Sequence, residues 1–220
     1  MANGPPSAES GGSIFEGATY LASAHSLRDL PLPGPPEIAF AGRSNAGKSS
    51  ALNTLVRHKR LAFTSKLPGR TQMINFFALR SAAVLVDLPG YGYAKVPATV
   101  REHWGAVVSA YLAGRTTLCG LVVIMDVRNP LTSLDEQLLR WFAPRGLPVH
   151  ALLTKSDKLS RQNAGQALAL VRAQLAKLGP DYSVQLFSAL TRAGVAEAES
   201  TLAAWLSSAR LAQDEVIPAP

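Results

Sequence analysis

The chain has 220 residues, of which 47% are hydrophobic and 17% are charged, and its formal net charge is +7. These values are those of a soluble globular protein whose single domain is large enough to bury a core. The longest apolar run, at residues 118–125, is too short to cross a bilayer, and a single cysteine, Cys119, excludes an internal disulfide and a cysteine-based metal cage.

Both ends of the chain read as tails. Residues 1–13 are predicted to be a disordered N-terminal tail and residues 211–220 a flexible C-terminal tail, because both are rich in small, polar and proline residues. Residues 14–210 are predicted to form one domain. The first residues have neither a basic start nor an apolar segment, so no secretory signal is indicated, and we expect a cytoplasmic protein without membrane contact.

Short apolar runs alternate with longer helical patterns along the chain. Several runs are apolar at consecutive positions, which is typical of strands buried on both faces of a mostly parallel sheet. The predicted strands are residues 37–42, 73–79, 82–87, 118–126, 149–155 and 183–189.

The helical patterns between these strands have recognisable ends. One begins at Pro97, a favourable first-turn residue. Another opens with Thr132 ahead of Asp135, a capping signature, and a third stops at Gly179. The predicted helices are residues 48–56, 97–114, 132–143, 160–179 and 194–209. Alternation of strands and helices predicts an α/β sandwich with right-handed crossovers and helices on both faces of the sheet.

The strongest motif is GRSNAGKSS, which lies between the first predicted strand and the first predicted helix and fits G-x-x-x-x-G-K-[ST]. Its glycines let the backbone wrap a phosphate, while loop amides and the helix N-terminus supply donors. Lys48 is expected to reach the β- and γ-phosphates, and the Ser49 hydroxyl to bind Mg²⁺. The predicted nucleotide contacts here are Gly42, Arg43, Ser44, Asn45, Ala46, Gly47, Lys48, Ser49 and Ser50.

A second acidic group ends the third predicted strand. Asp87 is placed to hold the hydration shell of Mg²⁺, and Gly90 offers a backbone N–H that can approach a γ-phosphate. D-x-x-G by itself is as often a plain turn as a site, but its place after a phosphate loop makes it specific. The predicted contacts are Asp87, Leu88, Pro89 and Gly90.

The stretch TKSD, at residues 154–157, follows the apolar run VHALL of the fifth predicted strand and indicates which base is bound. The Asp157 carboxylate can accept hydrogen bonds from guanine N1–H and N2–H₂, whereas adenine would leave it unpaired. The stem of Lys155 can lie against the base, and the Ala189 amide can bind guanine O6. The predicted base contacts are Thr154, Lys155, Ser156, Asp157, Phe187, Ser188 and Ala189.

A further candidate lies between the phosphate loop and Asp87. Thr71 is the natural choice for a mobile-loop threonine that reaches Mg²⁺ only when a γ-phosphate is present, although a turn hydroxyl is the alternative. Gly69 and Arg70 complete this predicted contact segment. The predicted metal ligands are thus Ser49, Thr71 and Asp87, and the predicted catalytic residues are Lys48, Thr71 and Gly90.

The positive charge is concentrated. There is no Asp or Glu between Ile38 and Val86, a stretch that contains eight Lys and Arg residues. Such a run fits a solvated basic face as well as it fits a patch that meets the phosphates of a nucleotide and of RNA.

Together the stretches GRSNAGKSS, PGRTQMINFF, DLPGYGYAKV, TKSDK and FSALTRAGV resemble the EngB (YihA/YsxC) family of bacterial ribosome-biogenesis GTPases, in the TrmE-Era-EngA-EngB-Septin-like superfamily. The similarity extends from about Pro35 to Ser208, and Ala46 and Ala51 depart from the larger aliphatic residues that the family favours. The resemblance implies a P-loop NTPase with a Ras-like G domain and a six-stranded, mostly parallel sheet, in which the strand at 73–79 is an antiparallel edge strand.

The resemblance also implies function. It implies binding of GTP, GDP and Mg²⁺, a role in large ribosomal subunit assembly, and a part in normal cell division and septation. In Ras-like hydrolases a glutamine after the D-x-x-G glycine orients the attacking water, but Tyr91 holds that position here. We therefore expect slow GTP hydrolysis that a partner or an ion accelerates. Asn45 resembles the asparagine that holds K⁺ in potassium-stimulated relatives, and a loop-shaping hydrogen bond is an equal alternative.

The resemblance and the basic stretch together suggest a partner. Our hypothesis is that GTP orders the loop after the first helix and presents Arg57, Lys59, Arg60 and Lys66 to the RNA of a large-subunit precursor. A regulatory switch that acts on a cell-division protein without RNA contact would keep every nucleotide motif and remains the alternative. An ATPase or phosphotransferase is a second rival, against which TKSD argues. We expect a monomer.

Overall fold

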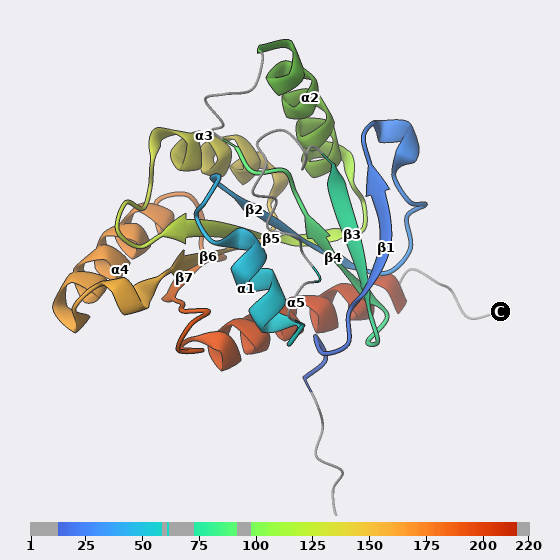
Figure 1. The fold of residues 1–220 in the computed structure, drawn as a ribbon. Helices are drawn as coiled ribbons and strands as arrows, with labels where there is room; N and C mark the ends of the chain where they lie inside the picture. The colour runs from blue at the N-terminus through green and yellow to red at the C-terminus, as the bar shows by residue number, and fades with distance from the viewer. Residues whose placement is uncertain (1–12, 59–60, 62–72, 92–97, 215–220) are drawn as a thin grey trace, which may run out of the picture.

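The computed structural model describes residues 13–58, 61, 73–91 and 98–214. In these residues the strands form one seven-stranded sheet in the order β1-β3-β4-β2-β5-β6-β7, with helices packed on both faces (Figure 1). The strands are β1 (Thr19–Ala24), β2 (Glu37–Gly42), β3 (Ile74–Leu79), β4 (Ala83–Asp87), β5 (Leu118–Asp126), β6 (Val149–Thr154) and β7 (Tyr182–Leu186). The predicted α/β architecture is confirmed.

Two details of the predicted sheet are wrong. The sheet has seven strands in the described part of the chain instead of six, because β1 was not recognised. The strand predicted as the antiparallel edge, β3, lies between β1 and β4 and is antiparallel to both. The first three residues of β1 are exposed, so its sequence lacks the buried run that marked the other strands. Its pairing with β3 includes a 2.6 Å hydrogen bond from the Ser23 hydroxyl to Oδ1 of Asn75.

The five predicted helices are present: α1 (Lys48–Leu55), α2 (Ala98–Gly114), α3 (Ser133–Phe142), α4 (Arg161–Leu175) and α5 (Val195–Asp214). The predicted capping signature of α3 is confirmed, since the Thr132 backbone N–H and hydroxyl both donate to Oδ2 of Asp135 at 2.8 Å. Helix α5 continues to Asp214, four residues into the expected C-terminal tail. Among the described helices, none is long and apolar enough to span a membrane.

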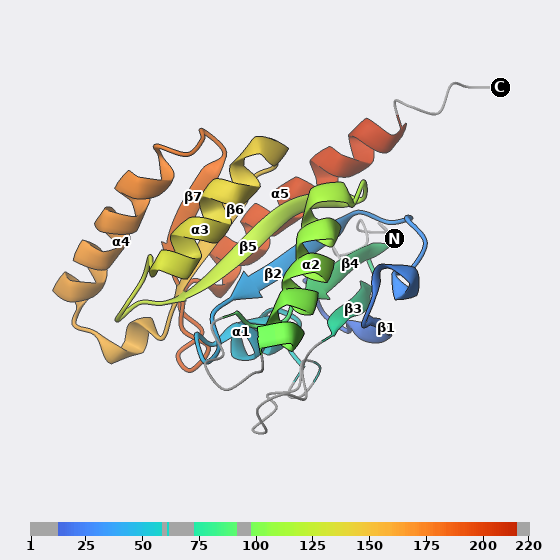
Figure 2. The same ribbon diagram turned by 90° about the horizontal axis from the view of Figure 1, so that it is seen from above.

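The helices divide between the two faces of the sheet, which Figure 2 shows from above. One cluster of buried apolar side chains joins the sheet to α2, α3 and α4 and contains Tyr111, Phe142 and Val171. The other joins it to α1 and α5 and contains Leu55 and Leu202. Burial of each such side chain contributes about 1.5–3 kcal/mol, so the central strands are the most firmly held part of the fold.

A buried polar network holds the amino end of β2. The Glu37 carboxylate is only 2% exposed and accepts hydrogen bonds from Tyr111 (2.7 Å), Thr117 (2.8 Å) and the Arg115 guanidinium. Arg115 also donates to the Pro31 carbonyl at 2.8 Å. Because a buried charge is tolerated only when it is paired and hydrogen-bonded, this network belongs to the scaffold.

The opposite end of the sheet collects the predicted site residues. Strands β2, β4, β5 and β6 are parallel, so their last residues, Gly42, Asp87, Asp126 and Thr154, lie at one edge. In open α/β sheets, ligands bind beyond the carboxyl ends of the strands. The fold therefore brings together motifs that are far apart in the sequence.

Candidate nucleotide site

The phosphate loop leads directly from β2 into α1. Gly47 has a φ of +103°, a conformation that favours glycine, and a Cβ at this position would lie 3.3 Å from the Thr154 hydroxyl. Asn45 has a φ of +65°, which asparagine tolerates better than most residues. The loop is closed by a 3.0 Å hydrogen bond from the Ala46 amide to the Arg43 carbonyl. This geometry directs the N-terminus of α1 toward the concave side of the loop, as an anion site requires.

Lys48 and Asp87, which the sequence assigns to phosphate and to magnesium, are in direct contact. The Lys48 ammonium forms an ion pair with Oδ1 of Asp87, and the two side chains are 10% and 4% exposed. Lys48 is the first residue of α1 and Asp87 is the last residue of β4. The contact places a cation, a carboxylate and a helix N-terminus together at the phosphate loop.

The residues at this point fit Mg²⁺. Hard cations prefer oxygen ligands, and Ser49 and Asp87 offer a hydroxyl and a carboxylate at the first turn of α1 and the end of β4. The described residues contain no group of three or more His, Cys, Asp or Glu side chains that could hold a metal by themselves. A magnesium ion here would therefore take most of its ligands from phosphate and water. The third predicted ligand, Thr71, lies outside the described residues, as do Gly69 and Arg70.

The D-x-x-G turn runs along the phosphate loop. The Tyr91 amide donates to the Gly42 carbonyl at 3.3 Å, and the Ser44 amide donates to the Tyr91 carbonyl at 3.0 Å. A Cβ at Gly90 would lie 3.2 Å from the Ser44 hydroxyl, so glycine permits this close approach. The predicted γ-phosphate contact thus lies directly against the predicted phosphate loop.

The side chain of Tyr91 faces α3. Its hydroxyl donates a 2.6 Å hydrogen bond to Oδ1 of Asp135. Burial raises the pKa of Tyr91 far above its ordinary value, and the charge of Asp135 and the hydrogen bond raise it further. The phenol is therefore a neutral donor that is committed to Asp135. In this arrangement it cannot serve as the water-orienting amide of Ras-like hydrolases.

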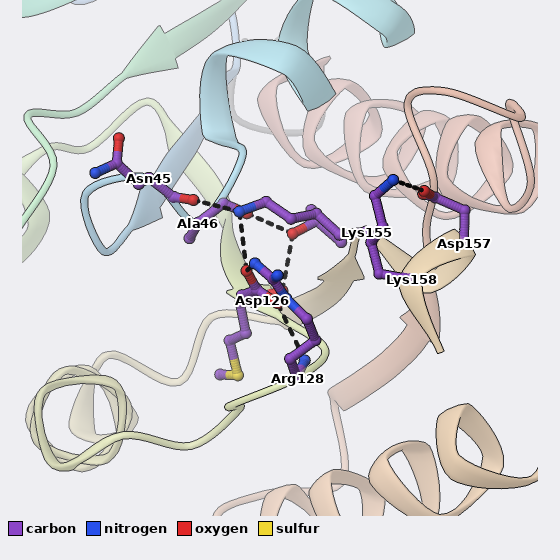
Figure 3. A network of polar contacts seen from close by, with 9 residues as sticks. Asn45, Ala46, Asp126, Arg128, Lys155, Asp157 and Lys158 are labelled. Carbon is purple, nitrogen blue, oxygen red and sulfur yellow. Dashed lines mark hydrogen bonds and ion pairs between the residues drawn. The ribbon is translucent and has the colours of Figure 1, made fainter. Parts of the chain in front are cut away.

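The TKSD stretch holds the other side of the phosphate loop (Figure 3). The Thr154 hydroxyl donates to the Ala46 carbonyl and, at 3.0 Å, to the Met125 carbonyl. The Lys155 ammonium donates to the Asn45 carbonyl at 2.6 Å and to Oδ2 of Asp126 at 2.9 Å. Lys155 has a φ of +59°, which turns the chain so that its side chain lies across the loop.

Asp126 is a site residue that sequence reasoning missed. It ends β5, next to Thr154 in the parallel register, and accepts from Arg128 at 2.9 Å as well as from Lys155. Hydrogen bonds from Arg128, followed by those from Lys155, lower the pKa of Asp126 far below its ordinary value. It therefore remains a fixed negative charge that orients Lys155. The feature of the sequence that could have identified Asp126 is a carboxylate at the end of a buried strand, the same feature that identified Asp87.

The two loops predicted to bind guanine are in contact with each other. The Ser188 hydroxyl donates a 2.6 Å hydrogen bond to Oδ1 of Asp157, and Lys158 lies 3.5 Å from Oδ2. The loops are also joined by a 3.2 Å hydrogen bond from the Ser156 amide to the Phe187 carbonyl. The hydrogen bond from Ser188 lowers the pKa of Asp157, so the carboxylate is ionised and oriented.

Some predicted contacts are restricted by burial. The side chains of Leu88 and Phe187 belong to the two apolar clusters of the core, so only their backbone is available for the predicted contacts with nucleotide.

Asn45 is exposed, and its left-handed backbone conformation gives a loop-shaping reason for an asparagine at this place. The basic residues Lys59, Arg60 and Lys66 lie outside the described residues, whereas Arg57 is half-exposed and 3.2 Å from Glu16.

A large hollow lies elsewhere. Its volume is about 1030 Å³, and it is found where β5, β6 and β7 begin, with Leu118, Pro148, Ser183 and Trp205 among its lining residues. None of the residues predicted from the motifs lines it. The phosphate loop and the D-x-x-G turn lie at the other end of the strands, so this hollow is separate from the predicted nucleotide contacts.

Comparison with known proteins agrees with this geometry. A family model described as "50S ribosome-binding GTPase" matches residues 37–155, more than half of the chain. Two curated bacterial proteins, both named "Probable GTP-binding protein EngB", are similar over most of the chain. The relative from Methylobacillus flagellatus is 59% identical, with 88% of this chain and 93% of that protein covered. The relative from Aromatoleum aromaticum is 56% identical, with 94% and 95% covered.

Solved structures share the fold. One described as a probable GTP-binding protein engB has a TM-score of 0.64 at 18% identity and covers 78% of this chain and 99% of its own. Bacterial selenocysteine-specific elongation factor EF-Sec has a TM-score of 0.58 at 21% identity and covers 79% and 29%. These likenesses show a P-loop GTPase fold.

Proposed function

We propose, starting from the fact that this chain belongs to the EngB family of GTP-binding proteins, that it is a slow GTPase switch acting in assembly of the large ribosomal subunit. The observation that best supports a guanine nucleotide is the Ser188 hydroxyl, which orients the Asp157 carboxylate two residues after Lys155, the residue that contacts the phosphate loop. The matching family model, described as a ribosome-binding GTPase, supports the ribosomal part of the proposal.

The base preference has a direct test. Replacing Asp157→Asn substitutes an amide donor for one carboxylate oxygen, which no longer suits the guanine amino group but suits the oxygen at C2 of xanthine. We expect the affinity for GDP to fall by on the order of a hundredfold or more, and the affinity for xanthosine diphosphate to rise. Asp181→Asn, an exposed residue at the other end of the molecule, is the matched control. Calorimetry in which ADP binds as well as GDP would overturn the assignment.

Hydrolysis by the isolated protein is proposed to be slow. Lys48 and Gly90 would bind the phosphates, and Thr71 would complete the site with Mg²⁺ held also by Ser49 and Asp87. Magnesium would neutralise charge that develops on the transferred phosphate. The slow rate follows from Tyr91, which stands where Ras-like hydrolases have a water-orienting glutamine. Its hydroxyl is hydrogen-bonded to Asp135 and is therefore not available to orient the attacking water.

We propose that a potassium ion bound at Asn45 accelerates GTP hydrolysis. Turnover in K⁺ and in Na⁺ is to be measured for the wild type and for Asn45→Ala. We expect faster turnover in K⁺, lost in the variant. Equal rates in all four measurements would eliminate the ion and leave the loop-shaping role of Asn45.

The ribosomal partner is proposed from the basic stretch that flanks the phosphate loop. The protein, acting as a monomer in the cytoplasm, would bind RNA of the large-subunit precursor when GTP is bound, and it would also have a role in normal cell division and septation. Sedimentation with precursor subunits should then depend on salt and on a GTP analogue in place of GDP. If charge reversal at Lys59 and Arg60 left this association unchanged, the alternative of a switch that acts on a cell-division protein would be favoured.

A further inference from the structure

Tyr91 connects two parts of the molecule that are distant in the sequence. Its backbone N–H and C=O are both hydrogen-bonded to the phosphate loop, at Gly42 and Ser44, and the Ser44 hydroxyl lies 3.3 Å from the same carbonyl oxygen. Its side-chain hydroxyl donates to Asp135 of α3 at 2.6 Å. The residue after the D-x-x-G turn is therefore held on both sides.

Asp135 is a buried acceptor with both oxygens in use. The residue is 2% exposed, its Oδ2 accepts the backbone N–H and hydroxyl of Thr132, and its Oδ1 accepts the Tyr91 hydroxyl. Separation of Tyr91 from Asp135 would leave Oδ1 without this donor. Because an unpaired buried carboxylate oxygen is costly, the hydrogen bond favours the conformation in which Tyr91 is held.

In the held conformation the turn lies close against the phosphate loop. Gly90 lies so close to Ser44 that even a methyl group would be in tight contact, and the Ser44 amide is already occupied by the Tyr91 carbonyl. A γ-phosphate that binds both the loop amides and the Gly90 N–H has to lie between these two segments. The turn must therefore separate from Ser44, and Tyr91 moves with it.

We propose that Tyr91 is a positioning residue whose hydrogen bond to Asp135 holds the D-x-x-G turn against the phosphate loop and so favours GDP over GTP. The inference rests on the proposed function, since it concerns the response of the same site to the γ-phosphate. Asp135 acts through Tyr91 and does not itself contact the nucleotide. The first turn of α3, whose cap shares the Asp135 carboxylate, becomes the element that reports the bound nucleotide.

The test is the ratio of two affinities. In Tyr91→Phe the ring remains and only the hydroxyl is lost, so the held conformation is less favoured. We expect the affinity for a non-hydrolysable GTP analogue, relative to that for GDP, to rise by on the order of tenfold. A ligand can shift a conformational equilibrium only through its differential affinity, so the ratio reports the conformation directly.

A matched control is present in the chain. The Tyr111 hydroxyl donates to the buried Glu37 carboxylate at 2.7 Å, a hydrogen bond of the same kind at the other end of the sheet. Tyr111→Phe should lower the melting temperature without changing the affinity ratio. If Tyr91→Phe gives the same result as Tyr111→Phe, the role of Tyr91 is structural and the proposal is overturned.

A second measurement uses the wild-type protein and decides the matter if Tyr91→Phe does not fold. Hydrogen exchange of the Thr132 and Glu136 amides, which donate to Asp135 and to the Thr132 carbonyl at the start of α3, should be several-fold faster with the GTP analogue than with GDP. Equal exchange in the two states would overturn the proposal. A wild-type protein that bound neither guanine nucleotide would instead overturn the proposed function, so the two failures are distinguishable.

Discussion

The Lys48 ammonium is paired with the Asp87 carboxylate, and both groups are almost closed to solvent. Loss of one partner from such a pair leaves an uncompensated buried charge, which costs more than the pair itself contributes. The phosphate-binding lysine is therefore also a structural residue when no nucleotide competes for it.

This pairing predicts an effect on stability in the absence of nucleotide. Lys48→Met should lower the free energy of unfolding by about 3 kcal/mol, measured by urea denaturation without nucleotide. The double variant Lys48→Met, Asp87→Asn should recover part of this loss, because the buried charge is removed as well. Lys177→Met, at an exposed lysine of the α4 region, is the control. Equal losses in the single and double variants would contradict the prediction.

The hydrogen bond between Ser188 and Asp157 predicts an effect on base recognition. In Ser188→Ala the carboxylate loses its orienting donor and the influence that lowers its pKa. We expect the affinity for GDP to fall by about tenfold in calorimetric titrations at neutral pH. Ser208→Ala, at an exposed position of α5, should bind GDP as the wild type does. An unchanged affinity in Ser188→Ala would mean that Asp157 does not need this orientation.

The close packing of Gly120 on β5 predicts that a larger side chain at this position destabilises the fold. A Cβ at this position would lie 2.3 Å from the Trp205 ring, so Gly120→Ala should lower the free energy of unfolding by about 1–3 kcal/mol. Gly165→Ala in α4, where nothing lies within 4 Å, should instead be neutral or stabilising by up to about 1 kcal/mol. Combination with Trp205→Leu should restore most of the loss at Gly120. Thermal unfolding of the four proteins measures this, and a failure of the rescue would point to backbone strain.

His150 on β6 predicts a loss of stability in mild acid. The residue is 3% exposed and its ring contacts Ser183 (2.7 Å) and Gln185 (2.8 Å). Burial lowers the pKa of His150, while the hydrogen bond with Gln185 and then the charge of Glu197 act in the opposite direction without reversing the shift. Since the unfolded chain binds this proton more tightly, the contribution of His150 is complete above about pH 6.5 and decreases as the pH falls below that value.

The slope is expected to steepen as the pH falls below 6.5 and to approach at most about 1.4 kcal/mol per pH unit, measured by urea denaturation from pH 7.5 to 5. His150→Gln retains a polar group but does not titrate, so its profile in this range should be flatter. Parallel profiles for the two proteins would show that His150 is not the group responsible.

The sequence alone determined the features whose cause is local. The buried runs at β2 and β5 were placed to the residue, since consecutive apolar positions distinguish a central strand without reference to its neighbours. The phosphate loop was recognised because its glycine, lysine and serine pattern lies within a few residues of Lys48, and the φ of +103° at Gly47 is a requirement of the local backbone. The Thr132 cap of α3 is local in the same sense.

Only the tertiary structure decided features that depend on a distant partner. β1 is a strand because β3 is beside it, and its half-exposed residues carry no pattern of their own. Asp126 became part of the site through Lys155, and Tyr91 acquired a role through Asp135, 44 positions away. A hydrogen bond between side chains leaves no periodicity in a sequence, so such partners are identified only when the order of strands in the sheet brings them within reach.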